Sequence, residues 1–178
     1  MSGLRSLYLS ALSVRKVGRH MYTASIITVS DRAYKGVYED QSGPAVNQIL
    51  KESGYKIVRQ QIIPDDREKI IRTLTDESND GVHLIITTGG TGFAPRDVTP
   101  EATLAVIEKE APGVAEYMRM RSMELTPRGM LSRGIAGIRK SSLIINLPGS
   151  PKGAVENLGF ILPHLLHGLD MLNGKSES

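Results

Sequence analysis

Residues 82–88 constrain the fold of this chain more than any other segment, because they form a short, nearly continuous apolar run. Such a run is typical of a strand at the centre of a parallel sheet, where helices cover both faces. The glycine-rich sequence Gly89-Gly90-Thr91-Gly92 follows it directly. We therefore expect a parallel sheet with a glycine loop at the carboxyl end of one of its central strands.

Strand and helix patterns alternate along the rest of the chain. Apolar and β-branched residues predict further strands at residues 22–30, 55–63 and 142–147. Helix signals predict helices over 42–53, 64–79, 99–110 and 114–125, and a last one after Pro151 that Pro163 interrupts. The predicted caps are Ser42, Asp65 and Thr99. Residues 126–140 fit a short helix or a hairpin equally well.

This alternation predicts an α/β fold: one three-layer domain over residues 21–174, with a mainly parallel sheet covered by helices on both faces. A length of 178 residues, 40% of them apolar, is enough for one core. Residues 1–20 are expected to be a disordered or non-native extension, because the first strand pattern begins directly after Met21. Their Ser, Leu and Arg content, without acids, also resembles a mitochondrial transit peptide.

Composition excludes several classes of function. The chain has no cysteine, so thiol nucleophiles and thiolate metal sites are excluded. Residues 1–20 hold four of the 22 basic residues and none of the 19 acidic ones, which leaves a nearly neutral body. With 4% aromatic residues and no Trp, that body argues against nucleic-acid binding. No apolar run approaches the roughly 20 residues of a membrane span, so we expect a soluble, cytoplasmic protein.

The glycine loop has the features of a phosphate site. Glycines let backbone N–H groups approach an anion closely, and the positive end of the helix predicted at Thr99 lies nearby. The loop is not a Walker loop, because no Gly-Lys-Ser/Thr sequence follows, and its glycine spacing does not fit the dinucleotide pattern. Taken alone, the pattern also fits a plain turn. A phosphate site of another kind is therefore predicted here.

Two carboxylates are expected beside this loop. Asp97 lies within it, and Asp65 follows the strand predicted at 55–63. Since ligands bind at the carboxyl ends of parallel strands, both could meet over a phosphate chain and hold Mg²⁺ together with substrate oxygens. The competing interpretation is that Asp65 caps a helix and Asp97 stabilises a turn. Arg32, Arg96 and Lys152 are secondary candidates for neutralising phosphate charge.

Five segments of the chain form a distinctive set. They are Ser30-Asp31-Arg32-Ala33, Asp40-Gln41-Ser42-Gly43-Pro44, Ile63-Pro64-Asp65, TGGTGFAPRDVTPEAT at residues 88–103, and Asn146-Leu147-Pro148-Gly149-Ser150-Pro151. Together they resemble the molybdopterin adenylyltransferase family, which includes the gephyrin-type G domain. The resemblance extends over residues 22–172, and its longest motif is far more specific than a generic glycine loop.

The resemblance implies an enzyme of molybdenum cofactor biosynthesis that uses Mg²⁺ and ATP to adenylylate molybdopterin, with release of pyrophosphate. By the same resemblance, Asp65 and Asp97 are the catalytic and metal-binding acids. The residues expected to bind the substrates are Ser30, Thr88, Gly89, Gly90, Thr91, Gly92, Pro148, Gly149 and Ser150.

The resemblance also implies a homotrimer that hands its product to a separate molybdenum insertase. Two other functions remain open at this point. One is a non-catalytic molybdopterin-binding carrier that keeps the loop, and the other is a scaffold that acts through self-association.

Overall fold

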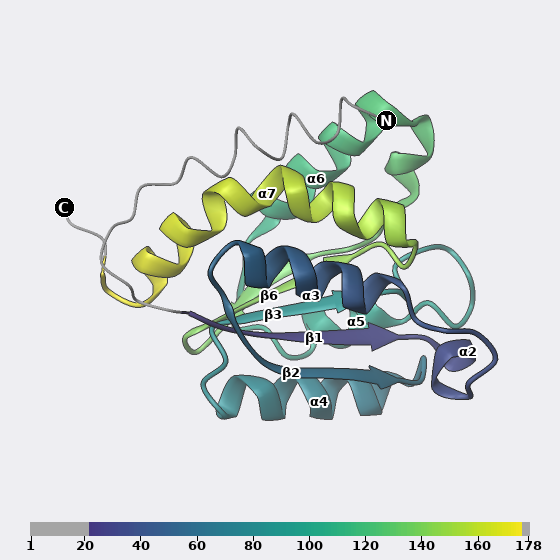
Figure 1. Ribbon diagram of the computed structural model, residues 1–178, viewed down its shortest axis with the longest axis horizontal. Coiled ribbons are helices and arrows are strands. Elements are labelled where there is room, and N and C mark those ends of the chain that lie inside the picture. Colours follow the sequence, from purple (N-terminus) through teal and green to yellow (C-terminus); the bar gives the residue numbers. More distant parts are fainter. Residues whose placement is uncertain (1–21, 176–178) are drawn as a thin grey trace.

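A computed structural model describes residues 22–175, so the predicted extension at 1–20 lies outside the described residues. Within them the chain forms one six-stranded sheet with the order β2-β1-β3-β6-β5-β4 (Figure 1). Strands β2, β1, β3 and β6 are mutually parallel, and β5 and β4 add an antiparallel edge. The strands are β1 (Thr23–Val29), β2 (Lys56–Ile63), β3 (Leu84–Thr88), β4 (Lys109–Glu110), β5 (Ala136–Arg139) and β6 (Ser142–Leu147).

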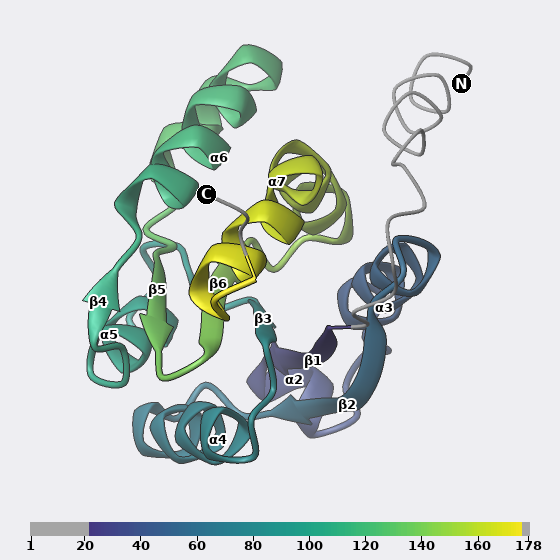
Figure 2. The ribbon, with the colours of Figure 1, turned by 90° about the vertical axis from the view of Figure 1, so that its left-hand side faces the viewer.

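Helices cover both faces of the sheet, which confirms the predicted α/β fold. On one face lie α3 (Ser42–Glu52), α6 (Pro112–Leu125) and α7 (Pro151–Leu172), and on the other α4 (Arg67–Asn79) and α5 (Thr99–Leu104) (Figure 2). A hydrophobic core lies on each face of the sheet, and alternate side chains of β1 pack into one or the other. Ile26 packs on the side of α3, α6 and α7, and Ile27 on the side of α4 and α5. The central strands are therefore buried on both faces, as their apolar sequences predict.

Register places the ends of the parallel strands side by side. Thr28 of β1 pairs with Thr88 of β3, and Thr88 pairs with Leu147 of β6. At the other side of β1, Val29 pairs with Ile63 of β2. The loops that follow these four strands therefore all start at the carboxyl ends of the strands, to the right in Figure 1. The short helix α2 (Asp31–Tyr34) lies in the first of these loops.

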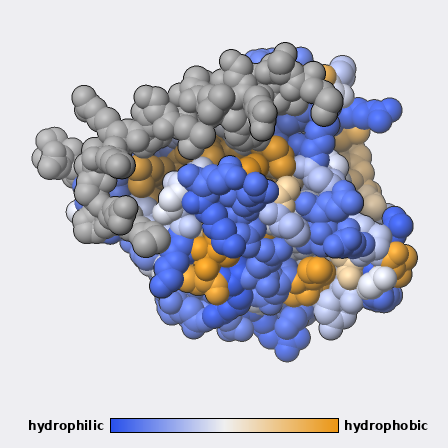
Figure 3. Space-filling view, in the orientation of Figure 1, coloured by the Kyte–Doolittle hydropathy of each residue, from blue (hydrophilic) through white to orange (hydrophobic). Residues whose placement is uncertain are grey.

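Strand β2 forms an exposed edge of the sheet. Most of its side chains are accessible, including those of Val58 and Ile62. Figure 3 shows separate apolar patches among hydrophilic residues in the lower half of the view, and a longer apolar strip in the upper part. Separate apolar patches among hydrophilic residues are ordinary for a protein surface in contact with water.

The helix predicted from Thr99 to Glu110 is too long, because α5 ends at Leu104. The amide of Glu108 donates to the carbonyl of Ile138 at 2.8 Å, and β4 then pairs with β5. Ile107 also packs directly over Gly137, whose missing side chain leaves room for it. Pairing with a strand that is distant in sequence therefore outweighs the local helical pattern.

In the second half of the chain, one further prediction needs correction and one open alternative is resolved. Helix α7 continues through Pro163, because the flanking Ile161 and Leu165 remain buried in the core while proline removes only one backbone donor. The ambiguous segment 126–140 contains both alternatives: a 3₁₀ helix η1 (Pro127–Leu131) and a hairpin of β5 and β6 that turns at Lys140. None of the helices within residues 22–175 is long and apolar enough to cross a membrane.

Candidate functional site

A pocket of about 250 Å³ opens where the parallel strands end. Its wall combines strand ends with the loops that follow β1, β2, β3 and β6. Seven of the residues predicted from the sequence lie in that wall: Ser30, Asp65, Thr88, Gly89, Gly90, Asp97 and Gly149. The remaining lining residues are Thr28, Val29, Tyr38 and Ser42.

Four predicted residues lie just outside the pocket wall. Gly92 borders Asp97, since a Cβ atom at this glycine would lie 2.9 Å from the Asp97 carboxylate. Thr91 is buried, and Pro148 directly precedes the lining residue Gly149. The hydroxyl of Ser150 accepts the amide proton of Gly153 at 3.2 Å and caps α7.

The glycines allow three chain segments to meet. Gly89 has a φ of +101°, and a Cβ atom there would lie 2.3 Å from the carbonyl oxygen of Val29. A Cβ atom on Gly149 would lie 3.1 Å from the Cα atom of Gly89. Gly90 has a φ of +63°, and its added Cβ would lie 2.3 Å from the hydroxyl of Thr99. Only residues without a side chain fit this approach.

Thr99 binds carbonyl groups of the glycine loop, while several backbone amides of the loop remain without a hydrogen-bond acceptor in the part of the chain that the structure describes. The hydroxyl of Thr99 donates to the carbonyl of Gly89 at 2.9 Å, and the amide of Thr99 donates to the carbonyl of Gly90 at 3.1 Å. Within residues 22–175, the amides of Gly90, Thr91 and Gly92 have no protein acceptor. A row of free amides in glycine-rich backbone is an arrangement that binds anions. Thr99 thus fixes the loop, whereas the helix cap predicted at this residue lies at Val98.

The carboxylate of Asp65 is held by hydrogen bonds to the loop after β1, and not by the first amides of a helix. Its carboxylate accepts the amide of Asp31 at 2.7 Å, and the Asp31 carboxylate accepts the amide of Asp65 at 3.1 Å. The cap of α4 is the next residue, Asp66, which accepts the amide of Lys69 at 2.7 Å. The interpretation of Asp65 as a helix cap is therefore wrong.

The electrostatics of the pocket favour a cation near Asp65. Burial raises the pKa of Asp65, and the negative charges of Asp31 and Asp97 add to this effect. The pKa of Asp31 is lowered although burial opposes it, because Arg96 donates two hydrogen bonds of 2.9 Å to its carboxylate. Within the described residues, neither Asp65 nor Asp97 forms an ion pair. A raised pKa means that the Asp65 charge costs folding free energy above that pKa, a cost that a bound cation would offset.

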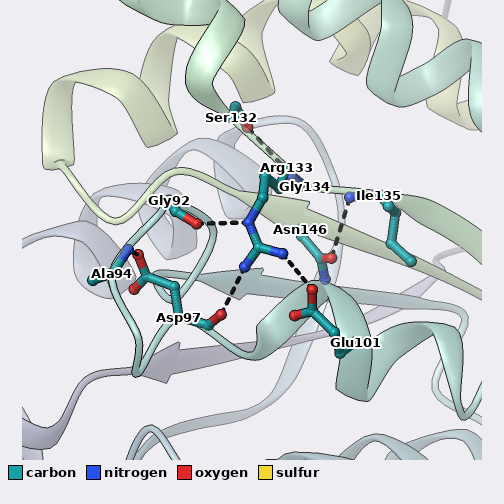
Figure 4. Close-up of polar contacts among 9 residues, drawn as sticks. All are labelled: Gly92, Ala94, Asp97, Glu101, Ser132, Arg133, Gly134, Ile135 and Asn146. Carbon is teal, nitrogen blue, oxygen red and sulfur yellow. Dashed lines mark hydrogen bonds and ion pairs between the residues drawn. The ribbon is translucent and has the colours of Figure 1, made fainter.

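Asp97 stabilises a turn with one carboxylate oxygen and also lines the pocket. Its Oδ2 atom accepts the amide of Ala94 at 2.9 Å, so the turn interpretation is correct for this oxygen (Figure 4). Asp97 also lines the pocket together with Asp65, and its charge is one of those that raise the pKa of Asp65. The described residues hold no cluster of three acidic or histidine ligands, so a metal ion here would need oxygen atoms from a substrate.

The basic candidates are engaged elsewhere. Arg96 is bound to Asp31, and the guanidinium of Arg32 lies 5.2 Å from the ring centre of Tyr38. Lys152 is exposed and lies 3.8 Å from Glu156. Tyr38 lines the pocket and Arg32 does not, so Arg32 contacts the pocket wall only through the ring of Tyr38.

Sequence reasoning missed a hydroxyl network at the floor of the pocket. Buried Asp40 accepts the hydroxyl of Thr28 at 2.6 Å and both the amide and the hydroxyl of Ser42 at 3.0 Å. The hydroxyl of Thr88 in turn donates to that of Ser42 at 2.9 Å. Ser42 is therefore not the cap predicted for α3, since Asp40 receives the first free amides. An Asp two residues before a Ser at a helix start was the available signal.

The sheet, the free glycine amides and the two acids define an α/β protein with a polar pocket at the carboxyl ends of its parallel strands. The family model described as "Probable molybdopterin binding domain" matches residues 25–167. The chain belongs to this family.

Individual relatives agree with this assignment. A molybdopterin adenylyltransferase of Helicobacter pylori J99 is 44% identical over 152 residues, which cover 84% of this chain and 86% of the relative. Gephyrin of Dictyostelium discoideum is 40% identical over 167 residues, but this chain, matched over 88% of its length, spans only 23% of that protein. The crystal structure of the molybdopterin biosynthesis enzyme MoaB from Thermus thermophilus superimposes with a TM-score of 0.83 at 42% identity, covering 89% of this chain and all of the other.

Proposed function

We propose that this protein transfers the adenylyl group of ATP to the terminal phosphate of molybdopterin and releases pyrophosphate. The observation that carries the proposal is that Asp65, Asp97 and the Gly89-Gly90 backbone line one pocket. The name of the Helicobacter pylori relative, at 44% identity, supports the same reaction. The carrier alternative keeps the loop but needs neither acid.

The reaction needs no protein nucleophile. A molybdopterin phosphate oxygen attacks the α-phosphorus of ATP, a new P–O bond forms, and the bond to the β-phosphate breaks. Such transfers depend mainly on positioning and charge neutralisation. The free amides of Gly90, Thr91 and Gly92 would orient phosphate oxygens. The close approach of the backbone at Gly89 and Gly149 would hold one wall of the pocket in place.

A divalent cation fits the acids that face the pocket. The raised pKa of Asp65, and the absence of an ion pair at either acid within the described residues, are the features expected of carboxylates that share a metal ion with a substrate. Asp65 and Asp97 would hold Mg²⁺. When bound, the ion would neutralise phosphate charge and withdraw electrons from the α-phosphorus.

Incubation of the purified chain with molybdopterin, ATP and Mg²⁺ should yield adenylylated molybdopterin and one equivalent of pyrophosphate. Mass spectrometry detects the first product, and a coupled phosphate assay the second. EDTA should stop the reaction, and excess Mg²⁺ should restore it. A chain that binds molybdopterin tightly but yields neither product under these conditions is a carrier.

We further propose a cytoplasmic homotrimer that passes its product to a separate molybdenum insertase. Exposed apolar side chains on α6 and η1 support self-association. These side chains are Met120, Met123, Leu125, Met130 and Leu131. Sedimentation equilibrium at micromolar concentration should return three times the 19.4 kDa chain mass. A stable monomer there would contradict this assembly, and cell fractionation tests the location.

A further inference from the structure

Arg133 lies behind the glycine loop, in the short link between η1 and β5. Its guanidinium donates 2.7 Å hydrogen bonds to the carbonyl oxygens of Gly92 and Asp97, and it pairs with the carboxylate of Glu101 on α5 (Figure 4). Its backbone amide donates to the carbonyl of Thr91 at 2.9 Å. One residue thus binds three carbonyl groups of the loop that carries Asp97.

Few other interactions hold this part of the loop in place. Residues 93–96 are exposed, and Phe93 is 70% accessible. Within the described residues, the other hydrogen bonds of segment 92–97 are the two between Ala94 and Asp97 and the pair from Arg96 to Asp31. Those between Ala94 and Asp97 are internal, so they set the shape of the turn but not its position. The Arg96 pair joins the outer, exposed part of the loop to Asp31 after β1, and Arg133 joins both ends of segment 92–97 to the opposite side, next to β5.

Arg133 can fix the loop because its own segment is anchored on two sides. The side chain of Arg119 on α6 donates to the carbonyl of Gly134 at 2.8 Å. Buried Asn146 on β6 exchanges backbone and side-chain hydrogen bonds with Ile135 and donates to the hydroxyls of Thr87 and Thr103. The arginine therefore projects from a rigid part of the fold.

The chemistry of the contact requires arginine. Hydrogen bonds from a charged donor are stronger than those between neutral groups, and a planar guanidinium can direct several donors at fixed angles. A lysine ammonium has three donors, but all of them are on one nitrogen atom, so it lacks the planar fork that spans Gly92 and Asp97.

We propose that Arg133 is a positioning residue for the adenylyl transfer: it sets the place of Asp97 relative to Asp65 without touching a substrate. This inference rests on the proposed function of the pocket. A misplacement of about 1 Å can cost roughly 100-fold in rate. Loss of the guanidinium should therefore lower kcat far more than it weakens ATP binding.

The test compares Arg133→Met and Arg133→Lys with Arg72→Met, a matched control at an exposed arginine on α4. We expect Arg133→Met to lower kcat about 100-fold with a KM for ATP within about 3-fold of the original value. Arg133→Lys should recover at most a tenth of the original activity, and Arg72→Met should change neither constant. An unchanged kcat in Arg133→Met overturns the proposal.

Hydrogen exchange provides a readout that does not depend on activity. In Arg133→Met, the hydrogen-bonded amides of Ala94, Asp97 and Thr99 should exchange at least about 10-fold faster, while amides of β1, β3 and β6 keep their protection. Equal exchange of these three amides in variant and original overturns the proposal, as does a loss of protection throughout the sheet in the milder Arg133→Lys. If the original chain forms no product, the proposed function fails, and loop exchange still decides whether Arg133 holds Asp97.

Discussion

Asp97→Asn is expected to lower the rate of pyrophosphate release from ATP and molybdopterin by at least about 100-fold, with little change in the thermal midpoint. Asparagine keeps the shape of the side chain, and its carbonyl oxygen can still accept the amide of Ala94. What disappears is the negative charge facing the pocket. Removing one electrostatic group from an active site typically costs about 100- to 1,000-fold in kcat.

Asp76→Asn is the matched control for this substitution, because Asp76 is exposed on α4 and the same charge is removed there. Calorimetric titration with ATP should show that Asp97→Asn retains most of the nucleotide affinity in the absence of metal. The kinetic measurement is single-turnover formation of adenylylated molybdopterin at saturating Mg²⁺. A fully active Asp97→Asn enzyme would refute the metal role assigned to this residue.

The meeting of Asp65 with the glycine loop could be predicted because the parallel direction of the strands was readable from the sequence. Apolar runs with the length of strands, separated by helix signals, imply parallel neighbours, and parallel neighbours bring their following loops to one edge. The choice between adjacent acids could not be read in the same way. Both Asp65 and Asp66 have the side chain and position of a helix cap, and only the contact with Asp31 decides that Asp66 takes this place.

Long-range contacts account for the elements that were predicted wrongly. Segment 99–110 has a helical pattern throughout, and its second half leaves the helix because β5 accepts it as a neighbour. Arg133 was missed for a related reason. Its three partners in the loop are backbone carbonyls 36 to 42 positions earlier in the chain, and every residue has a carbonyl, so the sequence does not mark which of them will be bound.

Gly89→Ala is expected to destabilise the fold by about 3 kcal/mol or more, from two separable causes. A φ of +101° is unfavourable for alanine, and the new Cβ would lie 2.3 Å from the Val29 carbonyl, which is backbone and cannot rotate away. Gly54 separates these causes, because its φ is +90° and nothing lies within 4 Å of an added Cβ. Gly54→Ala should therefore show only the conformational cost, about 1–2 kcal/mol.

Equilibrium urea unfolding of both variants measures the difference, which should be at least about 1–2 kcal/mol in favour of Gly54→Ala. Activity should separate them further. Gly89 joins the ends of β1 and β6 at the pocket, since its amide donates to the Leu147 carbonyl at 3.2 Å. A side chain here must move Val29 or Gly149, and either movement displaces the phosphate loop. Equal losses of stability in the two variants would mean that backbone conformation, and not the close approach of three chain segments, requires glycine at position 89.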